Sequence, residues 1–110
     1  MADRTANAMA RRIRERLDAE IAEARAAKPD SWQSRTLEDF VADLQEPRKV
    51  GVNFSGGAVL ECWMVTGNTG PYSVVYVPER DVFSLAVASV FGPVDISVHG
   101  PALSCYGSVY

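Results

Sequence analysis

Few residues of this chain are of the types that carry out chemistry, and the single histidine is the first of them. His99 follows Asp95 and Ser97 at steps of two residues. Alternate residues of a strand point to one face, so this spacing invites comparison with a Ser-His-Asp triad. Same-face neighbours in an extended strand lie about 6.6 Å apart, whereas a triad needs hydrogen bonds of about 2.6–3.2 Å. We therefore expect a polar strand face here rather than a nucleophilic site.

Glu61 is the second candidate, because it stands in the most apolar segment of the chain, residues 58–66. A carboxylate in apolar surroundings tends to hold its proton, which suits a general acid or base. Together with His99, Tyr76 and Tyr106 it would line a cup inside a curved sheet, as an enzyme or ligand carrier requires. An exposed position or a sheet edge explains the same residue more simply. We therefore expect no catalytic residue, and keep Glu61 and His99 as the candidates of the enzyme alternative.

The two cysteines and the glycine pair do not form a cofactor site. Cys62 and Cys105, with one histidine in the whole chain, are too few ligands for a Cys/His zinc site. Gly56 and Gly57 lie between two predicted strands, whereas a phosphate-binding loop leads into a helix N-terminus. We expect no metal and no cofactor, and we expect both cysteines to be reduced and buried.

Charge is divided sharply between the two halves of the 110-residue chain. Residues 1–49 hold ten Lys or Arg and ten Asp or Glu, while residues 50–110 hold one basic and four acidic residues. A composition of 47% hydrophobic and 23% charged residues is that of an ordinary globular protein, and the length suits one domain. We expect a single domain, 1–110, with a charged helical part (1–49) and an apolar, β-rich part (50–110).

Two helices are predicted in the first half. Apolar residues at steps of three and four predict a long helix from about 5 to 27, and they are Met9, Ala10, Ile13, Leu17, Ile21 and Ala24. A second stripe, formed by Leu37, Phe40, Val41 and Leu44, predicts a shorter helix over about 37–45. Pro47 is expected to end that second helix, since proline lacks the N–H group that a helix needs.

From Val50 onward the period of the apolar residues changes to two, which is typical of strands. Segments bounded by Gly and Pro turn signals predict strands at 50–54, 58–66, 72–77, 82–90, 94–99 and 102–109. Segment 82–91 also allows a helix capped by Asp81, but its valines and phenylalanines favour a strand. The expected fold is therefore α+β, with two N-terminal helices, one long and one short, packed on a five- or six-stranded antiparallel meander sheet.

The size of this sheet bears on function, because its strands are apolar on both faces. Two helices cover one face, so the other must curl on itself, form a pocket or meet another chain. If the meander is flat and larger than the two helices can cover, its uncovered apolar face is expected to be a docking surface for another protein. The expected contact residues are Arg11, Arg12, Trp63, Tyr76 and Tyr106.

The charge pattern of the first helix bears on the choice of partner. Its first turns carry five arginines (Arg4, Arg11, Arg12, Arg14 and Arg16), and acids follow on the same helix. The pI of about 5.0 and the absence of aromatic residues between the arginines disfavour a nucleic acid. Opposite charge blocks on one helix suit antiparallel pairing with an identical helix, which predicts a homodimer as an alternative.

The absence of a catalytic motif favours a function by binding. We interpret the sequence as a small cytoplasmic protein-binding module that acts by occupying a macromolecular partner. Stoichiometric inhibitors and immunity-type proteins, such as anti-CRISPR-like factors, share this size and lack of catalytic motifs. No apolar run is long enough for a membrane span and no secretory signal is evident, so we expect no membrane partner. The alternatives are a small enzyme or ligand carrier using Glu61 and His99, and a self-assembling structural protein.

Overall fold

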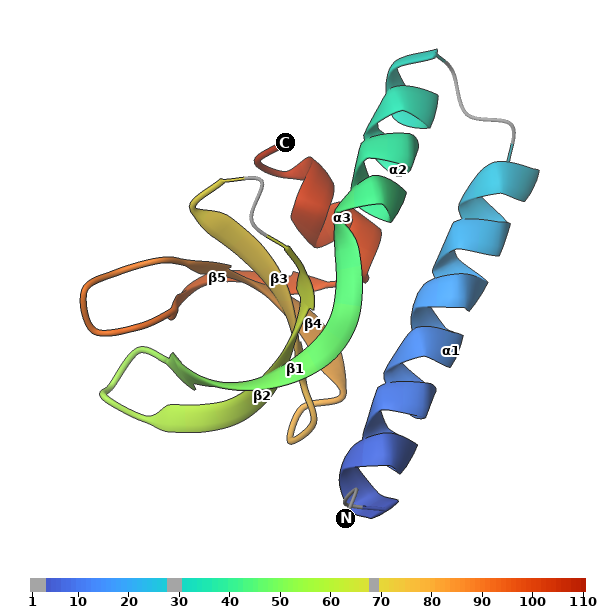
Figure 1. Cartoon of the computed structure of the whole chain (residues 1–110). Coiled ribbons are helices and arrows are strands. Elements are labelled where there is room, and N and C mark those ends of the chain that lie inside the picture. The colour runs from blue at the N-terminus through green and yellow to red at the C-terminus, as the bar shows by residue number, and fades with distance from the viewer. Residues whose placement is uncertain (1–3, 28–30, 68–69) are drawn as a thin grey trace.

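The computed structural model of the chain describes residues 4–27, 31–67 and 70–110. Its elements in chain order are α1 (Arg4–Ala26), α2 (Ser31–Asp43), β1 (Leu44–Asn53), β2 (Val59–Thr66), β3 (Tyr72–Val77), β4 (Val82–Val87), β5 (Val94–Gly100) and α3 (Ala102–Gly107) (Figure 1). A long helix and a shorter one precede a five-stranded antiparallel meander, which confirms the expected α+β fold.

The five strands follow one another in the sheet in chain order, and the sheet closes into a barrel. Closure rests on one parallel pairing between β1 and β5, at Asn53 and Val94. There the backbone N–H of Asn53 also donates to the carbonyl of Pro93 at 2.9 Å. Irregular register in the β1–β2 and β4–β5 ladders bends the sheet, as bulges do. The expectation of a flat meander is therefore wrong, and the second face of the sheet is covered because the sheet curls on itself.

Alternation along the strands sorts the buried apolar side chains into two cores. The helix-side core lies between the sheet and the helices, which all lie on one side of the barrel (Figure 1). It comprises Ile13, Leu17, Phe40, Trp63, Val65, Val74, Tyr76, Phe83, Leu85, Ala102, Cys105 and Tyr106. The barrel-side core comprises Val52, Phe54, Cys62, Met64, Val75, Val77 and Ala86. Neighbouring strand residues such as Val74 and Val75 therefore serve different cores, and both faces of the central strands are buried within this chain.

The predicted strand at 102–109 is wrong, because this segment forms the helix α3. Gly100 turns the chain with a φ of +141°, a conformation that favours glycine. The carboxylate of Glu20 on α1 then accepts the backbone N–H groups of Ala102 and Leu103 at 3.0 and 3.1 Å. The first N–H groups of a helix have no acceptor within it, so this distant carboxylate stabilises the start of α3. No local pattern in the sequence reveals such a contact.

Several other boundaries differ from the predicted ones. The second helix, α2, lies at Ser31–Asp43 rather than 37–45, and β1 begins at Leu44 rather than at Val50. Pro47 lies within β1, at the point where the register with β2 shifts, and such an irregularity tolerates the missing N–H group. The segment 82–90 is a strand only as far as Val87, so that residues 88–93 form a loop.

Candidate functional site

Three of the predicted contact residues lie in the core. Trp63, Tyr76 and Tyr106 are 6%, 1% and 2% exposed, and all three belong to the helix-side core. Their hydrophobic bodies pack against the helices and leave almost no surface for a partner. Sequence alone does not separate an aromatic residue in a core from one in an interface, because both occupy apolar strand positions.

The two predicted arginines of α1 differ from each other. Arg11 is exposed on the outer side of the helix. Arg12 turns towards the barrel and forms an ion pair with Asp81 at 3.4 Å. Arg14 likewise pairs with Glu46 of β1. Much of the positive charge that suggested pairing with a second helix is thus engaged within the chain.

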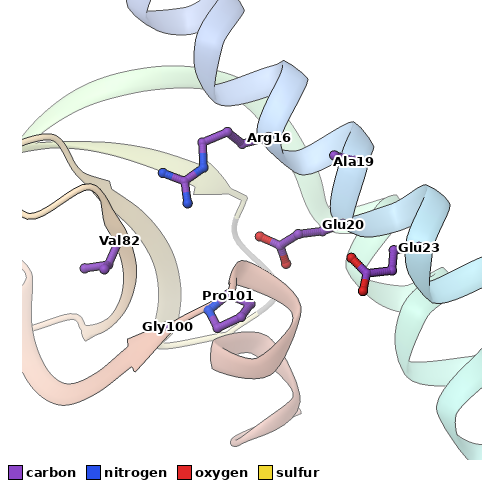
Figure 2. A pocket seen from close by; sticks show the side chains of 7 residues that line it. All are labelled: Arg16, Ala19, Glu20, Glu23, Val82, Gly100 and Pro101. Carbon is purple, nitrogen blue, oxygen red and sulfur yellow. The ribbon is translucent and has the colours of Figure 1, made fainter.

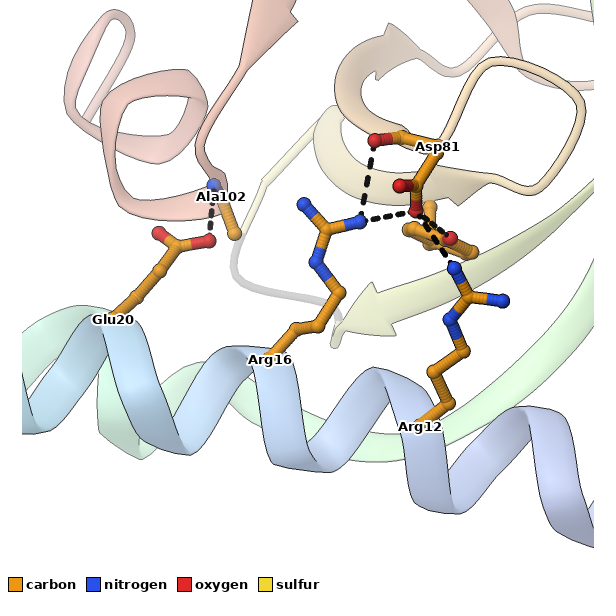
Figure 3. A network of polar contacts seen from close by, with 6 residues as sticks. Arg12, Arg16, Glu20, Asp81 and Ala102 are labelled. Carbon is orange, nitrogen blue, oxygen red and sulfur yellow. Dashed lines mark hydrogen bonds and ion pairs between the residues drawn. The ribbon is translucent and has the colours of Figure 1, made fainter.

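Asp81 is the centre of the densest polar cluster that connects α1 to the barrel (Figure 3). It lies in the turn between β3 and β4 with a φ of 52°, in the left-handed region. Its carboxylate accepts hydrogen bonds from the Tyr76 hydroxyl, Arg16 and Arg12, and its carbonyl accepts a second one from Arg16 at 3.2 Å. The guanidinium of Arg16 also lies 5.5 Å from the ring centre of Tyr76 and 5.6 Å from that of Phe83. We call Arg12, Arg16, Tyr76 and Asp81 the Asp81 cluster.

The electrostatics of the Asp81 cluster favour the charged carboxylate. The hydrogen bond from Tyr76, followed by the charges of Arg16 and Arg12, holds the pKa of Asp81 below its ordinary value. Burial, followed by the hydrogen bond to Asp81, raises the pKa of Tyr76. A carboxylate that favours its charged form, with two arginines and a phenol as donors, fixes α1 against the barrel.

A cavity of about 430 Å³ lies beside this cluster, between α1 and the start of α3 (Figure 2). Arg16 and Glu20 reach from α1 towards Val82 and Pro101 across it. Of the three charged side chains in the lining, Arg16 is engaged by Asp81 and Glu20 by the backbone N–H groups at the start of α3, and the third is Glu23. The lining contains no serine, cysteine or histidine. This cavity therefore lies where α1 packs against the barrel, and its lining contains no nucleophile for catalysis.

Glu61 and His99, the candidates of the enzyme alternative, lie on opposite faces of the sheet. Glu61 lies two residues from Trp63 and therefore on the same, outward face of β2. It is exposed, and its carboxylate forms an ion pair with Lys49 at 3.7 Å. The ring of His99 instead lies 6.5 Å from that of Phe54, a residue of the barrel-side core. The structure does not bring the two together, and Glu61 occupies the exposed position that the simpler interpretation expected.

His99 does contact Asp95, contrary to the spacing argument. Its Nε2 lies 3.1 and 3.2 Å from the two carboxylate oxygens of Asp95. The contact arises because β5 bulges between the pairs Ser84–His99 and Ala86–Asp95, and Ser97 there has a φ of 64°. Ser84 also donates to Asp95 and is fully buried. Because Ser84 donates to the carboxylate of Asp95 and not to the imidazole of His99, the three residues do not form the relay of a Ser-His-Asp triad.

The cysteines are free thiols in the two cores. Cys62 lies in the barrel-side core and Cys105 in the helix-side core, and burial raises the pKa of both thiols to about 11. Buried thiols of this kind are poor nucleophiles. Within the ranges that the structure describes, no three His, Cys, Asp or Glu residues gather where they could hold a metal ion. In the same ranges, no helix has the length and apolarity to cross a bilayer.

The feature that sequence reasoning missed is the loop 88–93. Val90 and Phe91 at its tip are 92% and 88% exposed, the largest exposures among the large hydrophobic residues that the structure describes. We call this pair the apolar tip. A signal is present in the sequence, because residues 82–94 contain no ionisable side chain and include the Gly92-Pro93 turn. The predicted strand, however, extends to Val90 and so includes part of the loop.

Hydrogen bonds hold the loop in one shape despite its exposure. The hydroxyl of Ser89 accepts from the backbone N–H of Phe91 at 3.1 Å and donates to the carbonyl of Gly92 at 2.6 Å. The side-chain amide of Asn53 on β1 donates to the carbonyls of Phe91 and Pro93 at 3.4 and 3.2 Å. The loop is therefore tied both to itself and to the neighbouring strand.

The apolar tip lies at the end of the barrel away from the helices, together with the β1–β2 hairpin (Figure 1). Val59, which pairs with Asn53 across that hairpin, is 62% exposed. No residue from 50 to 60 is ionisable either. Val59, Val90 and Phe91 are thus exposed apolar side chains in two segments that hold no ionisable residue. Charged side chains border these segments, since Glu61 follows Val59 by two residues and the guanidinium of Arg80 lies 5.1 Å from the ring centre of Phe54.

Comparison with known proteins gives no relative from which a function can be transferred. No family model, no curated protein and no solved structure matches the chain. The functional argument therefore depends on the geometry described above.

Proposed function

We propose that this chain is a small cytoplasmic protein-binding module that inserts its apolar tip into an apolar pocket of a protein partner. By occupying that pocket it acts stoichiometrically, in the manner of inhibitors and immunity-type proteins such as anti-CRISPR-like factors. The observation that carries the proposal is the near-complete exposure of Val90 and Phe91 on a hydrogen-bonded loop.

Burial of the tip supplies a favourable free energy at little cost. Moving a Val or Phe side chain from water into an apolar pocket gains roughly 1.5–3 kcal/mol. The hydrogen bonds of Ser89 and Asn53 already fix the loop, so little conformational entropy is lost on binding. The loop that carries the tip holds no ionisable side chain that would have to be stripped of water, which matches the depletion of charge at interface cores.

The alternatives receive less support from the same geometry. A small enzyme using Glu61 and His99 needs the two side chains on one face, and they lie on opposite faces. Self-assembly through α1 needs free charges, and Arg12 and Arg14 are paired within the chain. A protein pocket that receives the tip is therefore the favoured partner.

The test uses a photoreactive benzoyl-phenylalanine placed at position 91 in the full chain, expressed in the source cell. We expect a defined crosslinked product from position 91 and none from a matched chain with the same residue at Val109, which is 37% exposed on the helix side. Adding Val90→Ser to the position 91 chain should remove the product. Equal products from both positions, or a product insensitive to Val90→Ser, would overturn the proposal.

A companion measurement separates a partner from self-assembly. Light scattering of the purified chain should give the mass of a monomer. A dimer that photoreactive position 91 crosslinks to itself would instead favour the self-assembling alternative and contradict the proposed partner.

A further inference from the structure

Asn53 lies where the closure of the barrel and the apolar tip meet. It stands at the end of β1, and its pairing with Val94 is the one that joins β1 to β5 in the part of the chain that the structure describes. The same residue binds the loop 88–93 through both its backbone and its side chain. One residue therefore contributes to the fold and to the proposed binding surface.

The joint between β1 and β5 is the shortest between neighbouring strands of the barrel. β1 pairs with β2 along a ladder that extends from Leu44 to Asn53, and β3 pairs with β4 from Tyr72 to Val77. β1 and β5 instead share one register position, where the backbone N–H of Asn53 donates to the carbonyl of Pro93 at 2.9 Å. A joint with few backbone hydrogen bonds opens at a lower free energy than the ladders around it.

The side chain of Asn53 holds the loop from the β1 side of this joint. Its Nδ2 group donates to the carbonyls of Phe91 and Pro93, and an amide has two N–H donors for these two acceptors. The residues on either side of it, Val52 and Phe54, are buried in the barrel-side core, so packing fixes the position of Asn53. Opening of the joint therefore removes a rigid support from the tip.

The other hydrogen bonds of the loop do not cross the joint. The backbone N–H of Ala88 donates to the carbonyl of Pro71 at 2.8 Å, just before the start of β3. The bonds of Ser89 stay within the loop. Among the hydrogen bonds that the structure describes, those of Asn53 are the ones that connect the loop to β1. Asn53 is therefore the point through which opening of the joint reaches the tip.

We propose that Asn53 couples the closure of the barrel to the presentation of the apolar tip. While β1 and β5 are paired, its amide holds Phe91 in the shape that the pocket of a partner receives. When the pair opens, the loop loses these bonds, and binding then costs conformational entropy. The coupling is reciprocal, since a partner that binds the held tip also favours the closed barrel. This consequence for binding rests on the proposed function, whereas the coupling itself is measured on the chain alone.

Amide hydrogen exchange of the full chain, followed residue by residue by NMR, tests the coupling. Asn53→Ala removes both side-chain donors and leaves the backbone N–H in place. We expect the amides at positions 53 and 91 to exchange at least about tenfold faster, because the joint and the loop both loosen. The amide of Ala88 should stay within about twofold of the wild type, since its acceptor is Pro71. Asn7→Ala makes the same change at an exposed position of α1 and should leave all three amides unchanged.

A second variant separates the loop from the joint. Ser89→Ala removes the hydroxyl that bonds to Phe91 and Gly92 but leaves the contacts of Asn53 in place. It should speed exchange at position 91 and leave position 53 within about twofold of the wild type. If circular dichroism shows that Asn53→Ala is unfolded, Asn53→Ser takes its place with the same expectations, because one hydroxyl donor cannot serve both carbonyls.

Two exchange results would overturn the coupling. In the first, the variant at position 53 speeds exchange at position 91 alone or at neither position, so that loop and joint open independently. In the second, the amide of Ala88 is accelerated as much as the other two, so that the opening is not confined to the joint.

Crosslinking from position 91 extends the test to binding. In the chain with the photoreactive residue there, Asn53→Ala should lower the yield of product at least about fivefold, and Asn7→Ala should keep the full yield. No product from the parent chain would contradict the proposed function and leave the exchange results to decide on the coupling. An unchanged yield beside faster exchange would show that the held loop is not needed for binding. A lower yield with unchanged exchange would mean that Asn53 contacts the partner itself, and the proposal would then be wrong.

Discussion

The two ends of the barrel use their side chains in opposite ways. At the helix end, charges connect separate elements: Asp81 holds α1 through two arginines, and Glu20 holds the start of α3. At the other end there is no ionisable side chain from 50 to 60 or from 82 to 94, and the apolar tip is exposed. The charged half of the sequence therefore serves to hold the fold together. Surface available for binding is concentrated where the charges are absent, so substitutions should separate stability from binding.

The largest effect is expected from the helix-side core. Ile13 is fully buried where α1 packs on the barrel, and Ile13→Ala removes its side chain and leaves a cavity. We expect a loss of about 2–5 kcal/mol in the free energy of unfolding, measured by guanidinium denaturation. Glu15→Ala, at an exposed position one half-turn away, should change it by less than about 0.5 kcal/mol. If both variants unfold at the same denaturant concentration, α1 is not part of the cooperative fold and the comparison fails.

A smaller effect is expected from the Asp81 cluster. Asp81→Asn removes the charge and suits the left-handed backbone conformation, because asparagine adopts it readily. The pKa of Asp81 lies below its ordinary value of 3.8 in the folded chain, so the carboxylate stabilises the fold fully above about pH 4. That stabilisation is lost as the pH falls through the folded pKa. We therefore expect Asp81→Asn to lower the urea midpoint at pH 7 and the difference from the wild type to shrink at pH 3.

Asp95→Asn is unsuitable as a control for this titration, because its carboxylate has three donors of its own. Glu79→Gln is matched instead, since Glu79 lies in the same turn and is exposed. Its urea midpoint should follow that of the wild type at both pH values. A difference between Asp81→Asn and the wild type that persists unchanged at pH 3 would mean that the ion pairs do not hold α1.

Elements defined by a local period could be predicted from the sequence. The stripe containing Ile13 and Leu17 gave α1 to within one or two residues, because one face of that helix packs on the barrel. The segment 72–77 is a strand with the predicted bounds, since Gly70-Pro71 and Pro78 flank its β-branched and aromatic residues. In both places the local preference agrees with the tertiary packing.

Features that depend on distant contacts could not be predicted in this way. The start of α3 depends on Glu20, which is 82 residues away from Ala102. The approach of His99 to Asp95 depends on a bulge, which changes the spacing that an ideal strand would impose. Barrel closure depends on one pairing, between Asn53 and Val94. Because the sheet closes there, its second face is buried inside the barrel. Periodicity describes one element at a time and contains no information on such pairings.

The candidate sites follow the same division. Alternation places Trp63, Tyr76 and Tyr106 in predicted apolar strands, but it cannot tell that Trp63 and Tyr76 face the helices or that Tyr106 lies on a helix. The cavity that α2 and the C-terminal tyrosines line depends on α2 lying beside α3, whereas the sequence predicts a strand where α3 lies. The apolar tip was visible as an uncharged run, but a loop and a strand of that composition look alike until the end of β4 at Val87 is known.

The smallest effect on stability is expected from substitutions in the apolar tip. These substitutions test most directly whether the two ends of the barrel serve stability and binding separately. Phe91 is 88% exposed, so Phe91→Ser removes few contacts from the folded chain and should change the free energy of unfolding by less than about 0.5 kcal/mol. Phe83→Ser makes the same chemical change at a fully buried position and should cost at least about 3 kcal/mol. Denaturant titration of both variants measures the contrast. A loss above about 1 kcal/mol for Phe91→Ser would show that the tip packs within the chain or against a second copy, and the separation of stability from binding would then not hold.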